Sequence, residues 1–295
     1  MRGPETFLAG VICSTVLAAQ VPGAQIEPPR FLSGVSVVEV YASVTDADGA
    51  PVVGLNSLDF EVFEDGRQQT VSVFSADDMP LTVALGVDRS FSMAGVPLQL
   101  ASRAAVSFLR GLRPSDRSLV VSIGTEADIL APLAVAREAQ VRAVETLDAW
   151  GTTALLDATV TALDRLDAEP GRQALVVFSD GVDRYSRATA VDVLRRARHG
   201  NALVYLITIG RSRPPLMVEL AAVTGGRSFL VKDVRGLSSA LATILAELRS
   251  QYLLGFVPDR GVGPGAAEWR SIRVKLVGAR SAGARVRARD GYVAR

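Results

Sequence analysis

Between residues 81 and 250, short runs of apolar residues alternate with segments whose apolar residues recur every three or four positions. Runs such as 81–87 and 174–178 are almost free of polar side chains, which is typical of strands buried on both faces. The segments between the runs have the periodicity of amphipathic helices. A repeated strand–helix order places the strands in one mostly parallel sheet with helices on both faces. The sequence therefore predicts a doubly wound, Rossmann-like α/β domain over residues 80–250.

The elements of this domain follow from the apolar runs and from the glycines and prolines that end them. Strands are predicted at 81–87, 119–123, 174–178, 202–209 and 227–231, with an edge strand at 128–133. Helices are predicted at about 94–112, 137–147, 154–167, 189–198, 215–223 and 237–250.

The two flanks of this domain, 31–77 and 251–295, have the alternating pattern of half-buried strands. In the first flank, turn signals separate three strands of a predicted β-meander, at 35–44, 60–63 and 71–74. In the second flank, strands are predicted at 252–257, 271–277 and 284–288. Either flank alone is too short to bury a secure core. We therefore expect the flanks to pair into one small β-sandwich-like domain, with the α/β domain inserted between its halves.

The N-terminus has the pattern of a signal peptide over residues 1–25. Arg2 precedes an apolar run from Phe7 to Ala19, followed by small residues up to Ala24. The run has the length of a signal-peptide core and is too short to span a bilayer. Cleavage after Ala18 and cleavage near Ala24 both fit. No later stretch could anchor the chain in a membrane, so we expect an exported protein, periplasmic or extracellular.

Composition excludes several kinds of chemistry. The only cysteine, Cys13, lies in the predicted signal peptide, so the exported chain would have no thiol for a disulfide, a nucleophile or a metal. The only histidine, His199, lies in a basic stretch that reads as the last turn of a helix, which argues against a Ser-His-Asp triad. The formal net charge is +1, and nothing in its distribution indicates nucleic-acid binding. We therefore expect no enzymatic activity.

Oxygen-bearing side chains follow two of the predicted strands and precede one helix. Asp88, Ser90 and Ser92 come after the run 81–87, Asp180 comes after the run 174–178, and Thr153 precedes a helix. In an open α/β sheet, ligands bind outside the carboxyl ends of the strands. An all-oxygen set with two carboxylates suits a hard dication such as Mg²⁺. Taken singly, the residues have plainer explanations, since the hydroxyls could cap helices and Asp180 could belong to a turn.

This pattern resembles the metal-ion-dependent adhesion site (MIDAS) of von Willebrand factor A (VWFA) domains. The resemblance implies that Ser90 and Ser92 ligate the ion directly and Thr153 directly or through water. It implies that Asp88 and Asp180 act mainly through water and orient the hydroxyls. A sixth position would stay open for a carboxylate of a partner protein or surface ligand. Mg²⁺ is the expected metal, with Mn²⁺ and Ca²⁺ as alternatives.

The flanks resemble a narrower group, the exported bacterial "VWFA-related" proteins of the acidobacterial type. The resemblance lies in Ser57–Gly66 upstream and in Tyr252–Phe256 and Val286–Tyr292 downstream. It covers nearly the whole chain after the predicted signal peptide and implies nothing about the partner.

Phe91 departs from the family pattern, because these sites commonly have glycine at its position. Phe91 could line the rim of the site as an apolar contact, or its bulk could weaken the site. Arg89, Arg184 and Arg187 are expected near the rim, where they would steer an acidic partner or form a solvated basic loop. Trp150 could also be a rim contact, although a packed position is the commoner one for such a residue.

The sequence thus predicts a metal-dependent binding or adhesion module. A scaffold that the metal only stabilises is the alternative. A metal-assisted hydrolase fits less well, because no convincing general base accompanies the site.

Overall fold

The computed structural model describes residues 37–76, 79–263 and 266–294. The predicted signal peptide and both of its cleavage alternatives lie outside the described residues. No helix in the described ranges has the length and apolar character needed to cross a membrane.

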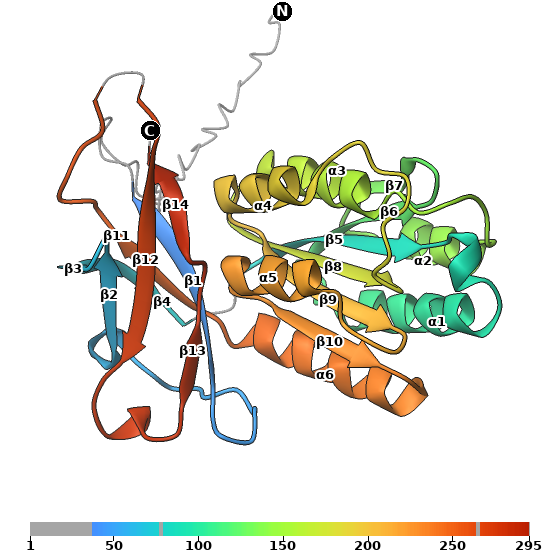
Figure 1. Cartoon of the computed structure of the whole chain (residues 1–295). Helices are drawn as coiled ribbons and strands as arrows, with labels where there is room; N and C mark the ends of the chain where they lie inside the picture. The colour runs from blue at the N-terminus through green and yellow to red at the C-terminus, as the bar shows by residue number, and fades with distance from the viewer. Residues whose placement is uncertain (1–36, 77–78, 264–265, 295) are drawn as a thin grey trace, which may run out of the picture. The chain divides into compact units, whose positions relative to one another are not determined.

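A six-stranded sheet forms the centre of the α/β part, in the order β10-β9-β8-β5-β6-β7 (Figure 1). All neighbours in it are parallel except β6 and β7, which are antiparallel, so β7 is the predicted edge strand. Every residue of the central strands β5 and β8 is buried, as their apolar sequences predict. The strands are β5 (Leu81–Asp88), β6 (Arg117–Ile123), β7 (Ala127–Ala134), β8 (Arg172–Ser179), β9 (Leu203–Ile209) and β10 (Arg227–Val231).

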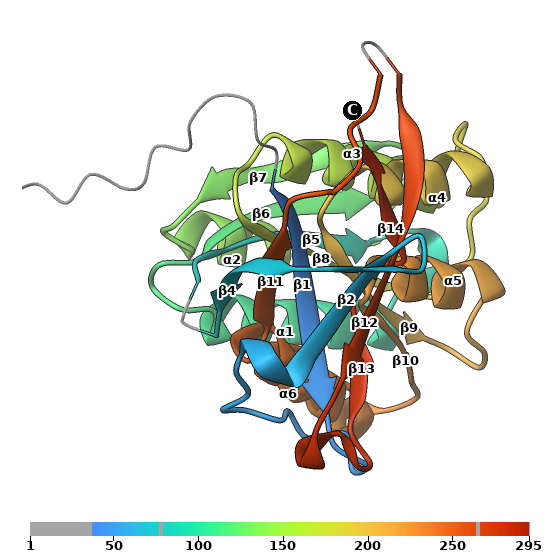
Figure 2. The ribbon, with the colours of Figure 1, turned by 90° about the vertical axis from the view of Figure 1, so that its left-hand side faces the viewer.

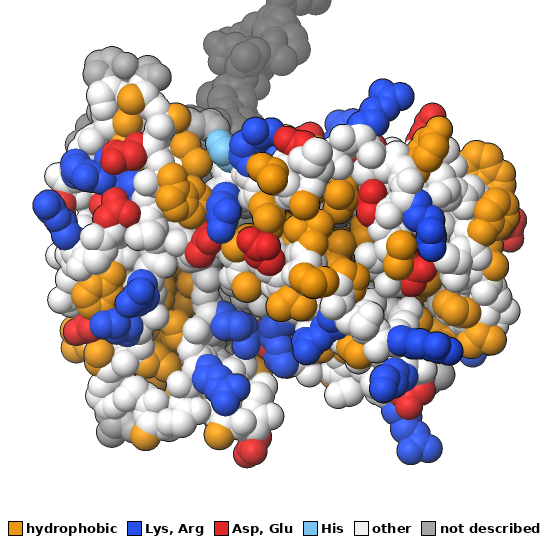
Figure 3. All heavy atoms as spheres, viewed as in Figure 1, with side chains coloured by type: hydrophobic (Ala, Val, Ile, Leu, Met, Phe, Trp, Pro, Cys, Tyr) orange, Lys and Arg blue, Asp and Glu red, His pale blue; other side chains and the backbone are white. Residues whose placement is uncertain are grey.

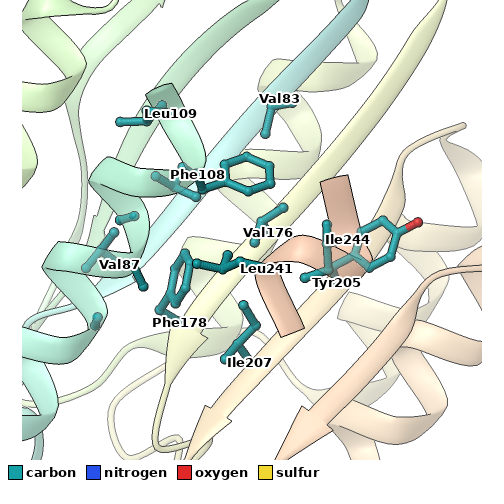
Figure 4. Packing of buried hydrophobic residues seen from close by; sticks show 14 of the residues in the cluster. Val83, Val87, Phe108, Leu109, Val176, Phe178, Tyr205, Ile207, Leu241 and Ile244 are labelled. Carbon is teal, nitrogen blue, oxygen red and sulfur yellow. The ribbon is translucent and has the colours of Figure 1, made fainter. Parts of the chain in front are cut away.

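Six helices cover the two faces of this sheet and confirm the doubly wound prediction. α1, α2 and α6 pack on one face, and α3, α4 and α5 on the other. On the first face, Phe108 and Leu109 of α1 and Ile244 of α6 lie over the strands (Figure 4). Burying a side chain of this size stabilises the fold by roughly 1.5–3 kcal/mol. The helices are α1 (Val96–Gly111), α2 (Glu138–Glu145), α3 (Leu155–Asp167), α4 (Ala190–His199), α5 (Pro215–Thr224) and α6 (Val234–Arg249).

The two flanks combine into two four-stranded antiparallel sheets, β13-β1-β11-β4 and β14-β12-β2-β3. Each sheet takes strands from both ends of the chain, so blue strands lie beside red ones in Figures 1 and 2. A third core lies between the sheets, where the rings of Phe60 and Tyr252 are 5.1 Å apart. The strands are β1 (Val38–Thr45), β2 (Phe60–Glu64), β3 (Arg67–Gln69), β4 (Val71–Ser75), β11 (Tyr252–Phe256), β12 (Glu268–Leu276), β13 (Arg285–Arg287) and β14 (Gly291–Ala294).

The predicted β-meander in the first flank is wrong. β1 pairs with β11 and β13, β4 pairs with β11, and β2 lies in the other sheet between β12 and β3. A meander would leave the apolar faces of these strands in one layer with nothing opposite. Placing β1 and β2 in different sheets lets Val40 and Val62 face a shared core, which is the packing that a sandwich provides.

Side-chain interactions link the sandwich strands to the α/β elements within the compact unit Ser36–Arg295. The carboxylate of Glu247 on α6 is fully buried, and its Oε1 lies 2.6 Å from Arg227 Nη1 of β10 and 2.7 Å from Arg287 Nη2 of β13. Nearby, Arg289 donates to Asn201 and, at 2.7 Å, to the carbonyl of Glu39. The buried carboxylate on α6 is therefore balanced by cations from two different sheets.

Candidate metal centre

Asp88 is the last residue of β5, at the carboxyl edge of the central sheet, and is 0% exposed. Both of its carboxylate oxygens accept hydrogen bonds. Oδ1 accepts from the backbone N–H of Ser90 at 2.9 Å, and Oδ2 accepts from the hydroxyl of Ser179 at 2.5 Å. These bonds fix the carboxylate and draw the chain after β5 into a tight turn.

Ser90 and Ser92 lie in that turn, with their hydroxyl oxygens 3.0 Å apart. Neighbouring ligands of an octahedral ion with metal–oxygen distances of about 2.0–2.1 Å are themselves about 2.9 Å apart. The two hydroxyls are therefore spaced as adjacent ligands of such an ion would be. Ser90 is buried and Ser92 is exposed, so the pair reaches from the interior of the site to solvent.

The capping explanation for the hydroxyls does not hold. α1 begins after Gly95, and the N-cap of α3 is Ala154; neither helix has a side-chain cap. Ser90 precedes a short 3-10 helix, η2 (Phe91–Met93), and its side chain makes no capping bond there either. The hydroxyls of Ser90, Ser92 and Thr153 are thus not needed for helix ends.

Thr153 is 1% exposed and lies just before α3. Its carbonyl accepts two N–H groups from the loop after β8, from Arg184 at 2.9 Å and from Tyr185 at 3.0 Å. Gly151, two residues earlier, has φ of 80°, and a Cβ there would lie 2.5 Å from Thr125 Oγ1. Only glycine fits this approach, and it brings the threonine loop close to the segment between β6 and β7.

Asp180 follows β8, the strand next to β5 in the sheet. Its Oδ1 accepts from the N–H of Val182 at 2.9 Å, so it does form part of a turn, as the plainer explanation proposed. The same residue acts on Asp88 electrostatically. Burial raises the pKa of Asp88 most, hydrogen bonds from Ser179 and Ser90 lower it, and the charge of Asp180 raises it. A cation between the two carboxylates would offset both of the effects that disfavour the charged form.

The structure brings the five predicted ligand residues to one edge of the sheet. Within the described residues, no three His, Cys, Asp or Glu side chains come together as a metal cluster. A metal here would therefore depend on hydroxyls as well as carboxylates, a donor set that suits Mg²⁺ better than softer metals.

The predicted rim residues lie on the same loops. Phe91 is 66% exposed, and Arg184 and Arg187 are exposed on the loop after β8. Arg89 is half-buried, and its Nε donates to the carbonyl of Asp148 at 2.8 Å. Trp150 is 60% exposed, so its expected packed position is wrong.

Sequence reasoning did not assign Ser179 a role in the site. Its hydroxyl donates to Asp88 and accepts from the N–H of Gly181 at 2.9 Å, so it joins the ends of β5 and β8. Its place directly before Asp180 was a signal, but the sequence did not show that β8 is the neighbour of β5. Asp183 belongs to the loop, where its Oδ1 accepts from the N–H of Leu156 and the hydroxyl of Ser186.

Comparisons with known proteins agree with this geometry. The sequence model of the von Willebrand factor type A domain family matches residues 83–182. This range begins in β5 and includes all five predicted ligands. A structure described as von Willebrand factor type A from Catenulispora acidiphila is 15% identical, with a TM-score of 0.53, and covers 90% of this chain and 75% of that chain. This likeness supports the fold. Residues 83–182 are therefore similar in sequence to a von Willebrand factor type A domain, and the six-stranded sheet with helices on both faces has the corresponding fold.

Other similar structures share less. The conserved hypothetical protein BatB from Bacteroides thetaiotaomicron is 18% identical over 56% of this chain and 97% of that chain, with a TM-score of 0.46. The PilB minor pilin from Streptococcus sanguinis is 12% identical over 60% of this chain and 63% of that chain, with a TM-score of 0.49. A search of curated proteins found no match to this chain.

Proposed function

We propose that the protein is an exported binding module in which a divalent cation, Mg²⁺ first, joins Asp88, Ser90, Ser92, Thr153 and Asp180 to a carboxylate of a partner protein. The observation that carries this proposal is the spacing of the Ser90 and Ser92 hydroxyls, 3.0 Å apart. These hydroxyls have no capping role, and their hydrogen bond to each other keeps them at this spacing before any ion binds.

Within this proposal the residues have distinct roles. Both carboxylate oxygens of Asp88 accept hydrogen bonds, from Ser90 and Ser179. Asp88 would therefore act on the ion through water and by orienting these serines, and not as a direct ligand. Ser92 is the exposed member of the set, so the partner approaches from its side. The bound cation supplies charge and direction for a carboxylate, and no bond needs to be made or broken.

A non-enzymatic role is part of the proposal. His199 ends α4, whose first residue follows the loop on the carboxyl edge, and its Nδ1 lies 2.7 Å from the carbonyl of Arg195. The only histidine is therefore at the far end of α4 from Asp88. This supports binding over metal-assisted hydrolysis, because the site has no neighbouring imidazole to act as a general base.

A metal-stabilised scaffold is the second candidate. It is favoured by the burial of Asp88, whose raised pKa makes a bound cation stabilising whether or not a partner exists. The two candidates differ in one respect: in the binding module a partner's carboxylate occupies the open coordination position of the metal, and in the scaffold no partner does.

Titration calorimetry with Mg²⁺ and with Mn²⁺ alone tests the site. We expect one ion per chain for the wild type and no measurable binding for the double variant Ser90→Ala, Ser92→Ala. Asp128→Asn is the matched control, because Asp128 is an exposed acid on β7 outside the site. Equal binding by the double variant would show that the metal site is elsewhere. The scaffold would be favoured if Mg²⁺ raised the melting temperature of the protein but no carboxylate-containing peptide bound to the protein in the presence of Mg²⁺.

A further inference from the structure

Exposed aromatic side chains gather around the candidate metal centre. Phe91, Trp150 and Tyr185 are 66%, 60% and 61% exposed, and each lies on a loop at the carboxyl edge of the central sheet. Hydrophobic side chains also come to the surface at the end of the α/β part toward which the parallel strands point (Figure 3). Large exposed apolar groups set among polar ones mark sites of protein interaction.

Backbone hydrogen bonds fix these aromatics relative to the site. Phe91 N–H donates to the carbonyl of Gly151 at 3.0 Å, and Trp150 N–H donates to the carbonyl of Arg89 at 2.7 Å. Tyr185 N–H donates to the carbonyl of Thr153, a predicted ligand. The rings therefore stand on backbone that is ordered before any partner arrives, which lowers the entropic cost of binding.

A groove begins beside the loops that contain Phe91 and Trp150, although neither aromatic residue lines it. It lies between α1 and the segment 145–149, with a volume of about 680 Å³. Gly95, four residues after Phe91, and Ala149, next to Trp150, are among its lining residues. Leu98, Val106 and Leu147 give it apolar walls. Pockets of roughly 300–1,000 Å³ hold small-molecule ligands, so this groove has room for an aromatic or large aliphatic side chain.

Two arginines lie on the other side of the site, together with acidic residues. The loop after β8 contacts the start of α3, where the carboxylates of Asp157 and Asp183 accept backbone N–H groups. Both acids are thus engaged within the protein. Arg184 and Arg187 of the same loop are exposed, and neither takes part in the ion pairs found within the part of the chain that the structure describes. These two exposed guanidinium groups are the positions on this side that can pair with an acidic group of a partner.

We propose that the partner presents an extended polypeptide segment with an aromatic or large aliphatic residue on one side of a metal-bound acidic residue and a second acidic residue on the other. The apolar side chain packs against Phe91 and Trp150 and enters the groove along α1. The second acid pairs with Arg184 or Arg187. This inference rests on the proposed function and specifies its partner.

Selection from a displayed library of random 12-residue peptides, on the intact protein with Mg²⁺, tests the proposal. We expect enriched peptides to contain an acid with an aromatic or large aliphatic neighbour and a further acid on the opposite side. Peptides enriched in acids alone would overturn the proposal and leave the proposed function standing. A library with no Mg²⁺-dependent enrichment of acids would contradict the proposed function itself.

Variants test the parts of the surface separately, and calorimetry measures the affinity of each variant for one enriched synthetic peptide. Phe91→Ala and the groove-filling Ser102→Trp should each weaken binding roughly tenfold, the usual effect at a well-packed contact. The double variant Arg184→Gln, Arg187→Gln should weaken only peptides that contain the second acid. Ala222→Trp, at an exposed position of α5, is the control and should bind as the wild type does. Unchanged affinity in Phe91→Ala and Ser102→Trp together would refute the groove.

Discussion

Two buried carboxylates in this protein have opposite surroundings. Glu247 on α6 lies within 2.7 Å of two arginine side chains, from β10 and β13, so its charge is balanced inside the protein. Asp88 at the end of β5 has only hydroxyl and N–H donors, and the nearby charge of Asp180 has the same sign. Burial is costly for any charge that lacks a partner. The first carboxylate is thus neutralised within the fold, whereas the second has no cationic side chain among its hydrogen-bond donors, and this is the position of the proposed cation.

The largest effect on stability is expected from removing the carboxylate of Glu247. Glu247→Ala removes a fully buried carboxylate and leaves Arg227 and Arg287, whose side chains are 32% and 26% exposed, without their shared partner, so we expect a loss of about 3 kcal/mol in the free energy of unfolding. Urea unfolding measures it. Glu145→Ala removes an exposed pair with Arg110 and should cost less than about 1 kcal/mol. Equal losses in the two variants would remove the structural distinction that the comparison draws.

Asp88→Asn should behave in the opposite way. The folded pKa of Asp88 is raised, so its contribution to stability is lost as pH rises through that value, and at neutral pH the buried charge opposes folding. In chelator we therefore expect the variant to be at least as stable as the wild type. With Mg²⁺ at a hundred times its Kd, the wild type should gain about 2.7 kcal/mol and the variant nothing. Thermal melts in chelator and in Mg²⁺ measure both stabilities. A variant that is less stable than the wild type in chelator would show that Asp88, like Glu247, has a structural role.

The smallest effect concerns Phe91. Because its side chain is largely exposed, Phe91→Ala should change the free energy of unfolding by about 0.5 kcal/mol or less. Mg²⁺ affinity should stay within about threefold of the wild type, since no ligand oxygen is altered. Calorimetry measures both ion and peptide binding. A large gain in Mg²⁺ affinity would instead mean that the bulk of Phe91 weakens the site.

Much of the fold could be predicted because the central strands are buried on both faces. β5, β8 and β9 are continuous apolar runs, and their boundaries agree with the predictions to within one or two residues. β3 and β14 were missed because they are short and have the sequences Arg-Gln-Gln and Gly-Tyr-Val-Ala, which lack an alternating pattern. The pairing of β1 and β2 with distant strands depends on a core that no local pattern shows.

In the candidate site, too, local sequence patterns predicted some features, and others depend on the tertiary structure. Asp88 and Asp180 were predicted correctly at the carboxyl edge of the sheet, because each follows a predicted strand and the carboxyl ends of parallel strands lie at the same edge. The role of Ser179 depends on which strands are neighbours, and the exposure of Trp150 depends on a loop conformation. The pairing of Glu247 with Arg287, forty residues later, leaves no sign in the local sequence.

The three site loops are joined through backbone groups, from Phe91 to Gly151, from Trp150 to Arg89 and from Tyr185 to Thr153. Side chains at positions 91, 150 and 185 are therefore free to vary while the geometry of the loops is kept. With the proposed metal dependence, randomising these three positions offers a route to affinity reagents that release their target on addition of a chelator. In natural variants, the same arrangement would let specificity diverge without changes to the proposed metal ligands.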